Sequence, residues 1–381
     1  MINRKKDIDN VKELLELFPA TAILGARQCG KTTLAKQFPV DHYFDLENPR
    51  DLVKFDNPQL LLEDLRGLIV IDEIQRKPDL FPLLRYLIDN DLKKKFLILG
   101  SASGKLMRQS SESLAGRIAY YRLGGLRLSD VGFDNIDKLW LTGSFPKAFT
   151  SKTNSAAFLW LDNYISTFLE RDIPQLGINI PAVTLRRFWI MLSHYHAQVL
   201  NYSEIANSFG VSDHTVRKYI DILSGTFMIR VLHPWYVNIG KRLVKRPKIY
   251  FRDSGVFHDL LSVNSNNNLL EHNKLGASWE GFALEIIANI LEKRDQELFF
   301  WRTHSGSEVD LFWQDSGKNL AIEFKFSDAP KLNKSMKTSI EALDLSHLWV
   351  VYPGKDIYKL NKKITVLPLK KFEVEFNNYN P

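Results

Sequence analysis

The stretch ATAILGARQCGKTTLAKQF, residues 20–38, decides the fold of the N-terminal third of this chain. It has the pattern of a buried apolar strand, a loop bounded by glycines and a helix, and it matches GxxxxGK(S/T). Backbone N–H groups of such a loop, with the N-terminus of the following helix, bind phosphate groups. The stretch therefore predicts a phosphate-binding loop for a nucleotide. Its residues are Gly25, Ala26, Arg27, Gln28, Cys29, Gly30, Lys31, Thr32 and Thr33.

Two side chains of this loop and two acids further along the chain predict ATP hydrolysis. Lys31 would neutralise the β- and γ-phosphate oxygens, and the hydroxyl of Thr32 would ligate Mg²⁺. In LIVIDEIQ, residues 68–75, four apolar residues typical of a buried parallel strand precede Asp72 and Glu73. Asp72 is predicted to hold the coordination shell of the Mg²⁺ ion, and Glu73 is predicted to polarise the water that attacks the γ-phosphate.

A third apolar strand, FLILGSAS at residues 96–103, contains Ser101 near its end. A polar side chain at this point can contact the γ-phosphate between the two other strands, so Ser101 is a candidate catalytic residue. The alternative is a serine with a purely structural role at a strand end. The residues alone leave both interpretations open.

Composition indicates an ordinary globular chain with more than one domain. It has 381 residues, of which 45% are hydrophobic and 25% charged. No apolar run approaches the roughly 18 residues that span a bilayer, and MINRKKDIDN lacks the apolar core of a signal peptide. The single cysteine, Cys29, excludes an internal disulfide, which fits a reducing compartment. We therefore expect a cytoplasmic protein without membrane partners.

The net charge of +7 is concentrated in one part of the chain. Residues 186–252 contain eleven Lys or Arg and only three acids. A local basic excess favours a polyanionic partner such as nucleic acid. A solvated basic face is the alternative explanation.

Four segments together resemble AAA+ ATPases that carry a C-terminal domain of unknown function, and the resemblance covers nearly the whole chain. They are GARQCGKTT, LIVIDE, LILGSAS and SLAGRIAYYRLGGL. The resemblance implies an ATPase core over residues 1–128 and a homo-oligomer. It also implies that Arg117, in the AGR segment, acts as an arginine finger toward a neighbouring subunit's nucleotide. The alternative for Arg117 is a salt bridge at the start of a strand.

Residues 129–180 predict a small helical lid or linker. Within them, Gly143 and Pro146 mark a loop that precedes the helical pattern DNYISTFLERDIPQLG, residues 162–177. Arg171 and Asp172 in LERDI match a feature of the same family. No chemistry follows from that match, and charges on a helix surface are the default interpretation.

Residues 201–225, NYSEIANSFGVSDHTVRKYIDILSG, have helix-turn-helix spacing. The pattern predicts a helix, a turn at Gly210 and a second helix capped by Ser212. One face of the second helix is apolar, and the opposite face would present side chains to a DNA major groove. The candidate DNA-binding residues on that face are His214, Arg217 and Lys218.

Two strands of a wing are predicted to follow this helix pair. FMIRVLHPWYV and PKIYFRD have strand patterns, with the basic KRLVKR between them. The family resemblance likewise implies a winged helix, over residues 181–262. Such domains also dock proteins, but the local basic excess favours DNA.

The stretch EVDLFWQDSGKNLAIEFKF, residues 308–326, predicts two strands joined by a hairpin or a short crossover at QDSGKN. Asp310 and Glu323 would then lie close together, with Lys325 beside them. Two carboxylates and a lysine can hold a divalent cation, Mg²⁺ or Mn²⁺, and orient a water against a phosphate. A surface salt-bridge ladder is the alternative.

An amphipathic helix pattern at residues 276–293 precedes these strands and bears Glu280 and Glu285. A helix acid, a strand Asp and then ExK is the order seen in the PD-(D/E)XK nuclease fold. This resemblance implies Glu280 as the helix carboxylate, Asp310 and Glu323 as metal ligands, and Lys325 as the residue that positions the nucleophile. Fold resemblance does not fix activity, and such folds also bind without cutting.

The sequence thus predicts an α/β chain in four segments. They are a P-loop AAA+ parallel sheet (1–128), a helical lid (129–180), a winged helix (181–262) and a PD-(D/E)XK nuclease-like α/β domain (263–381). We expect ATP hydrolysis with Mg²⁺ and action on DNA, with a second Mg²⁺ or Mn²⁺ as a candidate cofactor of the last segment. The alternatives are a DNA-binding ATPase switch with an inactive nuclease fold, and an ATPase adaptor that binds protein.

Overall fold

The computed structural model describes residues 2–91, 93–101, 112–175, 180–236 and 244–379. The chain forms two compact units. The first comprises residues 1–131, 144–147 and 225–228, and the second comprises residues 132–143, 148–224 and 229–381. In the described part, every helix is too short or too polar to cross a membrane.

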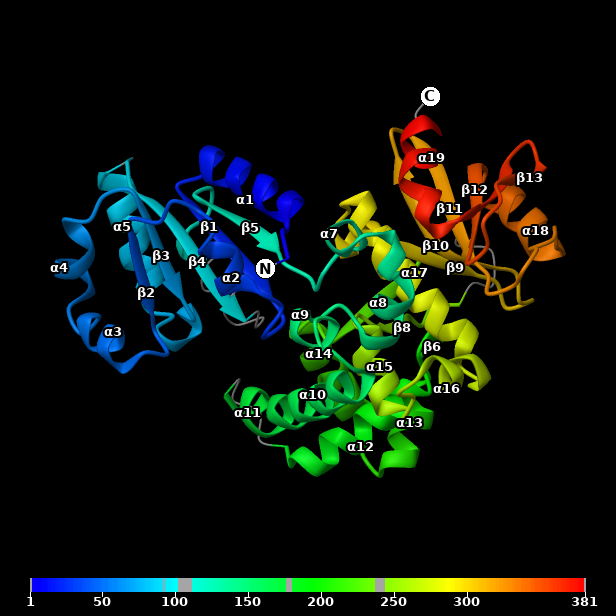
Figure 1. Cartoon of the computed structure of the whole chain (residues 1–381), viewed down its shortest axis with the longest axis horizontal. Coiled ribbons are helices and arrows are strands. Elements are labelled where there is room, and N and C mark those ends of the chain that lie inside the picture. The colour runs from blue at the N-terminus through cyan, green and yellow to red at the C-terminus, as the bar shows by residue number, and fades with distance from the viewer. Residues whose placement is uncertain (1, 92, 102–111, 176–179, 237–243, 380–381) are drawn as a thin grey trace. The chain divides into compact units, whose positions relative to one another are not determined.

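The first unit is built on a five-stranded parallel sheet (Figure 1), in the order β2-β3-β4-β1-β5. The strands are β1 (Ala20–Gly25), β2 (His42–Asp45), β3 (Leu68–Asp72), β4 (Lys95–Ser101) and β5 (Ile118–Arg122). β1 pairs with β4 so that Gly25 lies opposite Ser101. Because all five strands run the same way, the segments that follow β1 and β3 meet at one edge of the sheet. The α/β class predicted for this part is confirmed.

Apolar residues on both faces of this sheet form its core. Every residue of β1 is buried, and the central strands have the continuous apolar composition of a sheet covered on both sides. Leu80, Phe81 and Leu84 of α5 pack into this core. The helices of the unit are α1 (Lys5–Leu17), α2 (Lys31–Ala35), α3 (Pro49–Lys54), α4 (Pro58–Glu63), α5 (Leu80–Asn90) and α7 (Leu128–Val131), and α9 (Pro146–Phe149) lies at the unit boundary.

The second unit contains a mixed sheet in the order β13-β14-β12-β11-β10-β9-β7-β8-β6. The strands are β6 (Gln198–Val199), β7 (Ile229–Pro234), β8 (Lys248–Phe251), β9 (Phe299–Arg302), β10 (Glu308–Asp315), β11 (Lys318–Phe324), β12 (Leu345–Tyr352), β13 (Tyr358–Asn361) and β14 (Ile364–Pro368). β10 and β11 form an antiparallel hairpin, as one of the two predicted connections requires. Ser316 and Gly317 turn the chain there with φ of 48° and 77°, and such two-residue turns match the twist of the strands.

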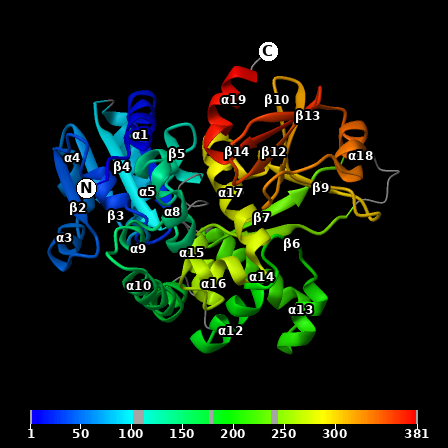
Figure 2. The same ribbon diagram turned by 45° about the vertical axis from the view of Figure 1, so that its right-hand side comes forward.

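The strands predicted for the wing and those of the C-terminal segment belong to one sheet. β7 pairs antiparallel with β8 on one side and parallel with β9 on the other. Figure 2 shows β7 and β9 side by side. Residues of β8 are therefore in the same sheet as residues of β10, although the two strands are far apart in the sequence.

The described helices of the second unit are α8 (Ile136–Thr142), α10 (Asn154–Thr167), α11 (Ile173–Gln175), α12 (Ala182–Ser193), α13 (Tyr202–Phe209), α14 (Asp213–Gly225), α15 (Ser254–Leu260), α16 (Asn266–Glu271), α17 (Leu275–Leu291), α18 (Lys334–Ala342) and α19 (Phe372–Tyr379). Of these, α15, α17 and α18 contact strands of the mixed sheet. Trp140 of α8 packs edge-on against Trp279 of α17, with ring centroids 5.3 Å apart. The segment predicted as a lid thus packs within the second unit. Arg171 and Asp172 lie in a π-helical turn, η3 (Phe168–Asp172).

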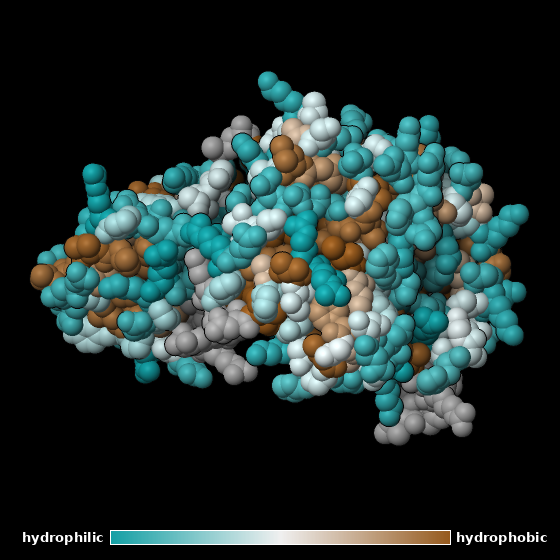
Figure 3. Space-filling view, turned by 90° about the horizontal axis from the view of Figure 1, so that it is seen from below, coloured by the Kyte–Doolittle hydropathy of each residue, from teal (hydrophilic) through white to brown (hydrophobic). Residues whose placement is uncertain are grey.

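Some apolar side chains reach the surface. On the face in Figure 3, hydrophobic groups are separated by hydrophilic ones. The most exposed large apolar residues in the described part include Val183 of α12 and Leu60 of α4. Scattered exposure of this kind is normal for a protein surface.

Candidate functional site

Backbone geometry explains the glycines of the phosphate-binding loop. A Cβ at Gly25 would lie 2.3 Å from the carbonyl oxygen of Leu123, so no larger residue fits there. Gly30 has φ of 105°, which residues with a side chain rarely adopt. The loop therefore leaves β1 and enters α2 by a path that these two glycines make possible.

The Lys31 ammonium is held against the loop itself. It donates hydrogen bonds to the carbonyl oxygens of Gly25, at 3.1 Å, and Ala26, at 2.9 Å. The residue is buried. A buried ammonium at the start of α2 adds positive charge where the helix N-terminus already favours an anion.

Thr32, Asp72 and Tyr43 form a connected polar group at the carboxyl edge of the sheet. The Thr32 hydroxyl donates to Asp72 Oδ2 at 2.7 Å, and the Tyr43 hydroxyl donates to the same oxygen at 2.6 Å. Burial and the bond to Asp72 raise the pKa of Tyr43 above its usual value. A hydroxyl and a carboxylate in contact are the hard oxygen ligands that Mg²⁺ prefers. Sequence reasoning identified Thr32 and Asp72 but missed Tyr43.

Glu73 follows Asp72 in a left-handed conformation, with φ of 55°. Such a conformation is costly for a residue with a side chain and is found disproportionately at functional sites. Burial raises the pKa of Glu73, although the nearby Lys31 ammonium opposes this change. The carboxylate also accepts a hydrogen bond from the side chain of Gln75. Glu73 is thus positioned near the loop with a proton affinity above that of an exposed carboxylate.

Three other residues were predicted around the loop: Ser101, Cys29 and Arg27. The backbone of Ser101 ends β4 beside Gly25, while its side chain lies outside the described part. Cys29 is buried, with its sulfur 3.5 Å from the carbonyl oxygen of Leu123, which fits a packing role. Arg27 forms an ion pair with Glu47 at 2.6 Å.

Arg4, which sequence reasoning missed, holds the loop from the N-terminal side. It donates to the carbonyl oxygen of Cys29 at 2.9 Å, and to those of Gly124 and Gly125 at 3.1 and 2.8 Å. Its Nε donates to the buried Asp7 at 2.6 Å. In the sequence, MINRKK looks like a solvated basic terminus, so nothing there marked Arg4 as a buried residue. The one signal of such a contact was the pair Gly124 and Gly125, because glycines let another group approach the backbone closely.

Arg117 lies away from this loop. Its guanidinium makes a two-point contact with Asp89, at 2.5 and 3.1 Å. The residue precedes β5 and is next to Ala20, at the start of β1, whereas the loop follows the end of β1. At about 3.3 Å per residue, β1 separates Arg117 from Gly25 by roughly 17 Å. The structure therefore does not bring Arg117 to the phosphate loop of its own chain.

The two helices expected for the helix-turn-helix occur in the predicted order. α13 ends at Phe209 and is followed by Gly210, which has φ of 68°, and α14 begins after Ser212. The predicted cap is confirmed, because Ser212 Oγ accepts from the Thr215 N–H at 3.2 Å. His214, Arg217 and Lys218 are exposed. The Arg217 guanidinium lies 3.9 Å from the ring centroid of Tyr202, so it also ties α14 to α13. Within KRLVKR, residues 241–243 lie outside the described part.

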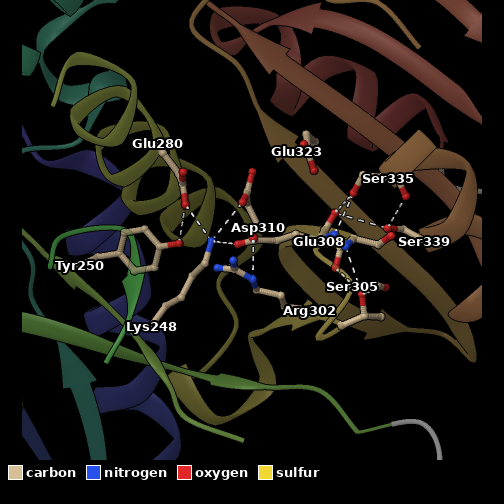
Figure 4. Close-up of polar contacts among 12 residues, drawn as sticks. Lys248, Tyr250, Glu280, Arg302, Ser305, Glu308, Asp310, Glu323, Ser335 and Ser339 are labelled. Carbon is tan, nitrogen blue, oxygen red and sulfur yellow. Dashed lines mark hydrogen bonds and ion pairs between the residues drawn. The ribbon is translucent and has the colours of Figure 1, made fainter. Parts of the chain in front are cut away.

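Four acids lie near one another in the second unit and are here called the carboxylate group; three of them contact one lysine (Figure 4). Its members are Glu280 of α17, Glu308 and Asp310 of β10, and Glu323 of β11. Lys248 Nζ lies 3.3 Å from Glu280 Oε1 and 3.2 Å from Asp310 Oδ1, and it also pairs with Glu308. The Tyr250 hydroxyl donates to Glu280 Oε1 at 2.7 Å.

Glu323 and Lys325 complete this arrangement. Lys325 Nζ lies 2.6 Å from Glu323 Oε1, while Glu323 Oε2 is buried and has no hydrogen-bond partner among the described residues. Burial, followed by repulsion from Asp310, raises the pKa of Glu280 to about 7 and that of Glu323 to about 8. Burial alone would lower the pKa of Lys248, but the carboxylates, Glu280 foremost, raise it well above its usual value.

The structure brings together the four residues predicted for a nuclease-like site: Glu280, Asp310, Glu323 and Lys325. Glu285, the other acid of that helix, instead pairs with Arg230 at 2.5 Å. Within the described ranges, no group of three or more His, Cys, Asp or Glu is arranged to hold a metal ion.

Sequence reasoning missed Lys248, Tyr250 and Glu308. Glu308 was detectable, since it lies two residues before Asp310 and therefore on the same strand face. Lys248 had a weaker signal, a single charge in a strand whose other three residues are apolar or aromatic.

Three family models cover most of the chain. Residues 17–132 match a model described as AAA domain. Residues 133–267 match one described as Domain of unknown function (DUF8612), and residues 275–372 match Domain of unknown function (DUF4143). The first match contains the phosphate loop, and the last contains the carboxylate group.

Comparisons with whole proteins extend this result. Uncharacterized protein Rv2008c of Mycobacterium tuberculosis and Uncharacterized protein Mb2031c of Mycobacterium bovis are each 43% identical over 372 residues, covering 97% of this chain and 84% of theirs. The Walker-type ATPase PABY2304 of Pyrococcus abyssi is 16% identical with a TM-score of 0.48, over 68% of this chain and 96% of that one. DnaA bound to AMPPCP and single-stranded DNA is 14% identical with a TM-score of 0.28, over 59% and 93%.

The similarity to the two solved structures is too low to support an argument, whereas the relatives of 43% identity span almost the whole chain. The AAA match at residues 17–132 and the C-terminal match at residues 275–372 occur in the order that the sequence motifs predicted. The chain therefore belongs to the family of AAA+ ATPases that carry a C-terminal domain of unknown function.

Proposed function

We propose that this protein binds ATP with Mg²⁺ at the phosphate loop of its first unit and hydrolyses it there. The observation that carries this proposal is the 2.7 Å hydrogen bond between Thr32 and Asp72, which puts a hydroxyl and a carboxylate together beside the loop. These two residues would hold Mg²⁺, which neutralises phosphate charge when bound. Lys31 and the backbone of residues 26–30 bind the phosphates.

Glu73 is the proposed general base for the attacking water. Its raised pKa makes it a better proton acceptor than an exposed carboxylate, and its left-handed backbone fixes the direction in which it leaves β3. Ser101 ends the strand between β1 and β3, and it is proposed to contact the γ-phosphate.

Replacing Glu73 by Gln tests the assignment. Glu73→Gln keeps the shape of the side chain and removes its basicity, so hydrolysis is expected to fall by about 100-fold or more while ATP still binds. Lys31→Ala is expected to abolish binding instead. Fluorescent-nucleotide titration and phosphate release measure the two effects, with the exposed Glu63→Gln as the matched control. A normal hydrolysis rate in Glu73→Gln would show that Glu73 is not the base.

DNA is the proposed partner of the second unit. The exposed His214, Arg217 and Lys218 lie on α14, the second helix of a helix-turn-helix, and α14 belongs to the basic stretch of residues 186–252. Of the two roles left open for the C-terminal sheet, cleavage of DNA and binding without cleavage, the ion pairs of Lys248 support the second. The adaptor alternative, in which α14 docks a protein, predicts no salt-dependent DNA binding.

Lys218→Ala separates these alternatives. If Lys218 contacts a phosphate, its loss weakens DNA binding and lowers the slope of log affinity against log salt by about 1. Lys359→Ala, an exposed lysine on β13, is the matched control and is expected to change neither. Equal effects of the two variants, or no DNA binding by the intact chain at low salt, would favour the adaptor.

A further inference from the structure

The carboxylate group already contains a positive charge at its centre. Lys248 is only 2% exposed, and its ammonium contacts Glu280, Glu308 and Asp310. Figure 4 shows the lysine side chain reaching from β8 between the acid of α17 and the acids of β10. An ammonium has three N–H donors, so three carboxylates use its full capacity.

A divalent cation at this place would compete with Lys248 for the same oxygens. Mg²⁺ needs carboxylate oxygens at about 2.0–2.1 Å from its own centre, whereas the oxygens of Glu280, Glu308 and Asp310 are arranged around the lysine nitrogen. The two cations would also repel each other at short range inside a buried site. Either the lysine or a metal ion can therefore neutralise these acids, but not both.

We propose that Lys248 is the resident cation of this nuclease-like site and replaces a divalent metal ion, so that the C-terminal sheet binds neither Mg²⁺ nor Mn²⁺ and does not cleave DNA. The lysine comes from β8, in the segment of the predicted wing, and the acids come from the C-terminal segment. The same contact that neutralises the acids therefore fastens these two parts of the sheet together.

Glu323 supplies an independent reason to regard the place as a cation site. Its Oε2 is buried and has no hydrogen-bond partner in the described residues, which is unusual for a carboxylate oxygen. With Lys248 removed, Glu323 would keep Lys325 and Glu308 would keep Arg302, at 3.5 Å, whereas Glu280 and Asp310 would have no ion-pair partner among the described residues. Buried acids without a counter-ion are strongly destabilised. A variant without the lysine is thus expected to take up a divalent cation.

Manganese binding by the whole chain without nucleotide tests the proposal. Electron paramagnetic resonance titration is expected to show no Mn²⁺ site in the carboxylate group of the wild type. Lys248→Ala, and Lys248→Met as the variant of closer size, are expected to gain one site at least ten-fold tighter than any in the wild type. Adding Asp310→Asn to Lys248→Ala is expected to remove it, and Lys359→Ala is the matched control.

Thermal unfolding gives a second readout. Loss of Lys248 is expected to lower the midpoint temperature, and Mn²⁺ is expected to restore part of that loss in Lys248→Met but to leave the wild type unchanged. Folded Lys248 variants without a new site would overturn the proposal. If both variants fail to fold, the wild type decides alone: absence of an Asp310-dependent Mn²⁺ site supports the proposal, and Mn²⁺ binding or DNA cleavage lost in Asp310→Asn overturns it. The result does not depend on whether the first unit hydrolyses ATP.

Discussion

Arg4 shows how much a single residue outside the motif contributes to the nucleotide site. Its guanidinium connects the loop carbonyl of Cys29 to the backbone of Gly124 and Gly125, and the residue is buried. Guanidinium groups have five donors in a fixed plane, which suits one side chain that must bond several carbonyl groups at once. Arg4 is therefore a positioning residue for the loop.

Replacing Arg4 tests this role. Hydrogen bonds to a charged group contribute about 1.5–3 kcal/mol, so Arg4→Ala is expected to weaken ATP binding by roughly 10-fold or more. Arg4→Lys keeps the charge but loses the planar donors, and it is expected to recover only part of the affinity. Nucleotide titration measures the change, with the exposed Lys5→Ala as control. An unchanged affinity in a destabilised Arg4→Ala would mean that Arg4 serves the fold alone.

A site residue could be predicted from the sequence only where its partners or its motif lie close to it along the chain. Lys31 and Thr32 could be assigned because the loop is contiguous, and Asp72 because it ends an apolar strand. Lys248 and Asp310 lie 62 positions apart, and nothing local indicates that they form an ion pair. Arg4 was hidden for the same reason, since its partners are brought close only by the pairing of strands.

At the scale of elements, local patterns predicted the helix pair and two strands joined by a hairpin or a short crossover, but they did not show which strands pair in the sheet. The turn at Ser316 and Gly317 was visible as SG between two apolar runs, so β10 and β11 followed from the sequence. The pairing of β7 with β9 was not visible, because parallel neighbours are set by packing and not by a turn.

Helices α8, α15 and α17 are joined by one buried polar network. His258 Nδ1 lies 2.9 Å from the carbonyl oxygen of Leu141, which can only accept, so Nε2 accepts from the Ser278 hydroxyl at 2.7 Å. The Trp140 indole donates to the same hydroxyl at 2.9 Å. Burial lowers the pKa of His258 to about 4. The network thus requires a neutral imidazole.

This requirement predicts a loss of stability in acid. An unfolded histidine titrates near 6.5 and the folded one near 4, so between these values the unfolded state binds more protons and stability falls as the pH falls. The difference corresponds to about 3 kcal/mol. His258→Gln keeps a donor and an acceptor but does not titrate, and it is expected to flatten urea-unfolding free energy against pH in this window. His196, whose pKa burial lowers to about 3, contributes a slope of the same sign in this window, so the His258→Gln variant keeps part of the pH dependence.

The measurement has a clear contrary outcome. If wild type and His258→Gln lose the same free energy between pH 6.5 and pH 4, acid destabilisation arises from other groups and the imidazole is not the cause. A constant difference between the two proteins would then report only the altered packing of the glutamine side chain.

At the scale of the whole molecule, assembly is the property on which the role of Arg117 depends. The residue lies roughly 17 Å along β1 from the phosphate loop of its own chain. It is partly exposed and paired with Asp89. A surface ion pair of this kind contributes only about 0–1 kcal/mol to stability, so its structural value is small. The family resemblance offers a second role, in which Arg117 reaches the nucleotide of a neighbouring subunit.

Mixing two inactive variants distinguishes the two roles. Arg117→Ala lacks the finger and Glu73→Gln lacks the base, but an interface between them can combine an intact base with an intact finger. In a ring of the two variants mixed in equal amounts, half of the subunits have an intact Glu73 and half of their neighbours have an intact Arg117, so roughly a quarter of the sites have both. The mixture is therefore expected to recover about a quarter of the wild-type hydrolysis rate. Asp89→Asn is the matched control: it breaks the same ion pair and leaves the finger, so its hydrolysis rate is expected to stay near that of the wild type. Equal rates in Asp89→Asn and Arg117→Ala, with no recovery on mixing, would mean that Arg117 acts only through the ion pair. A fully active monomer by light scattering would lead to the same conclusion, since a finger supplied by a neighbour requires one.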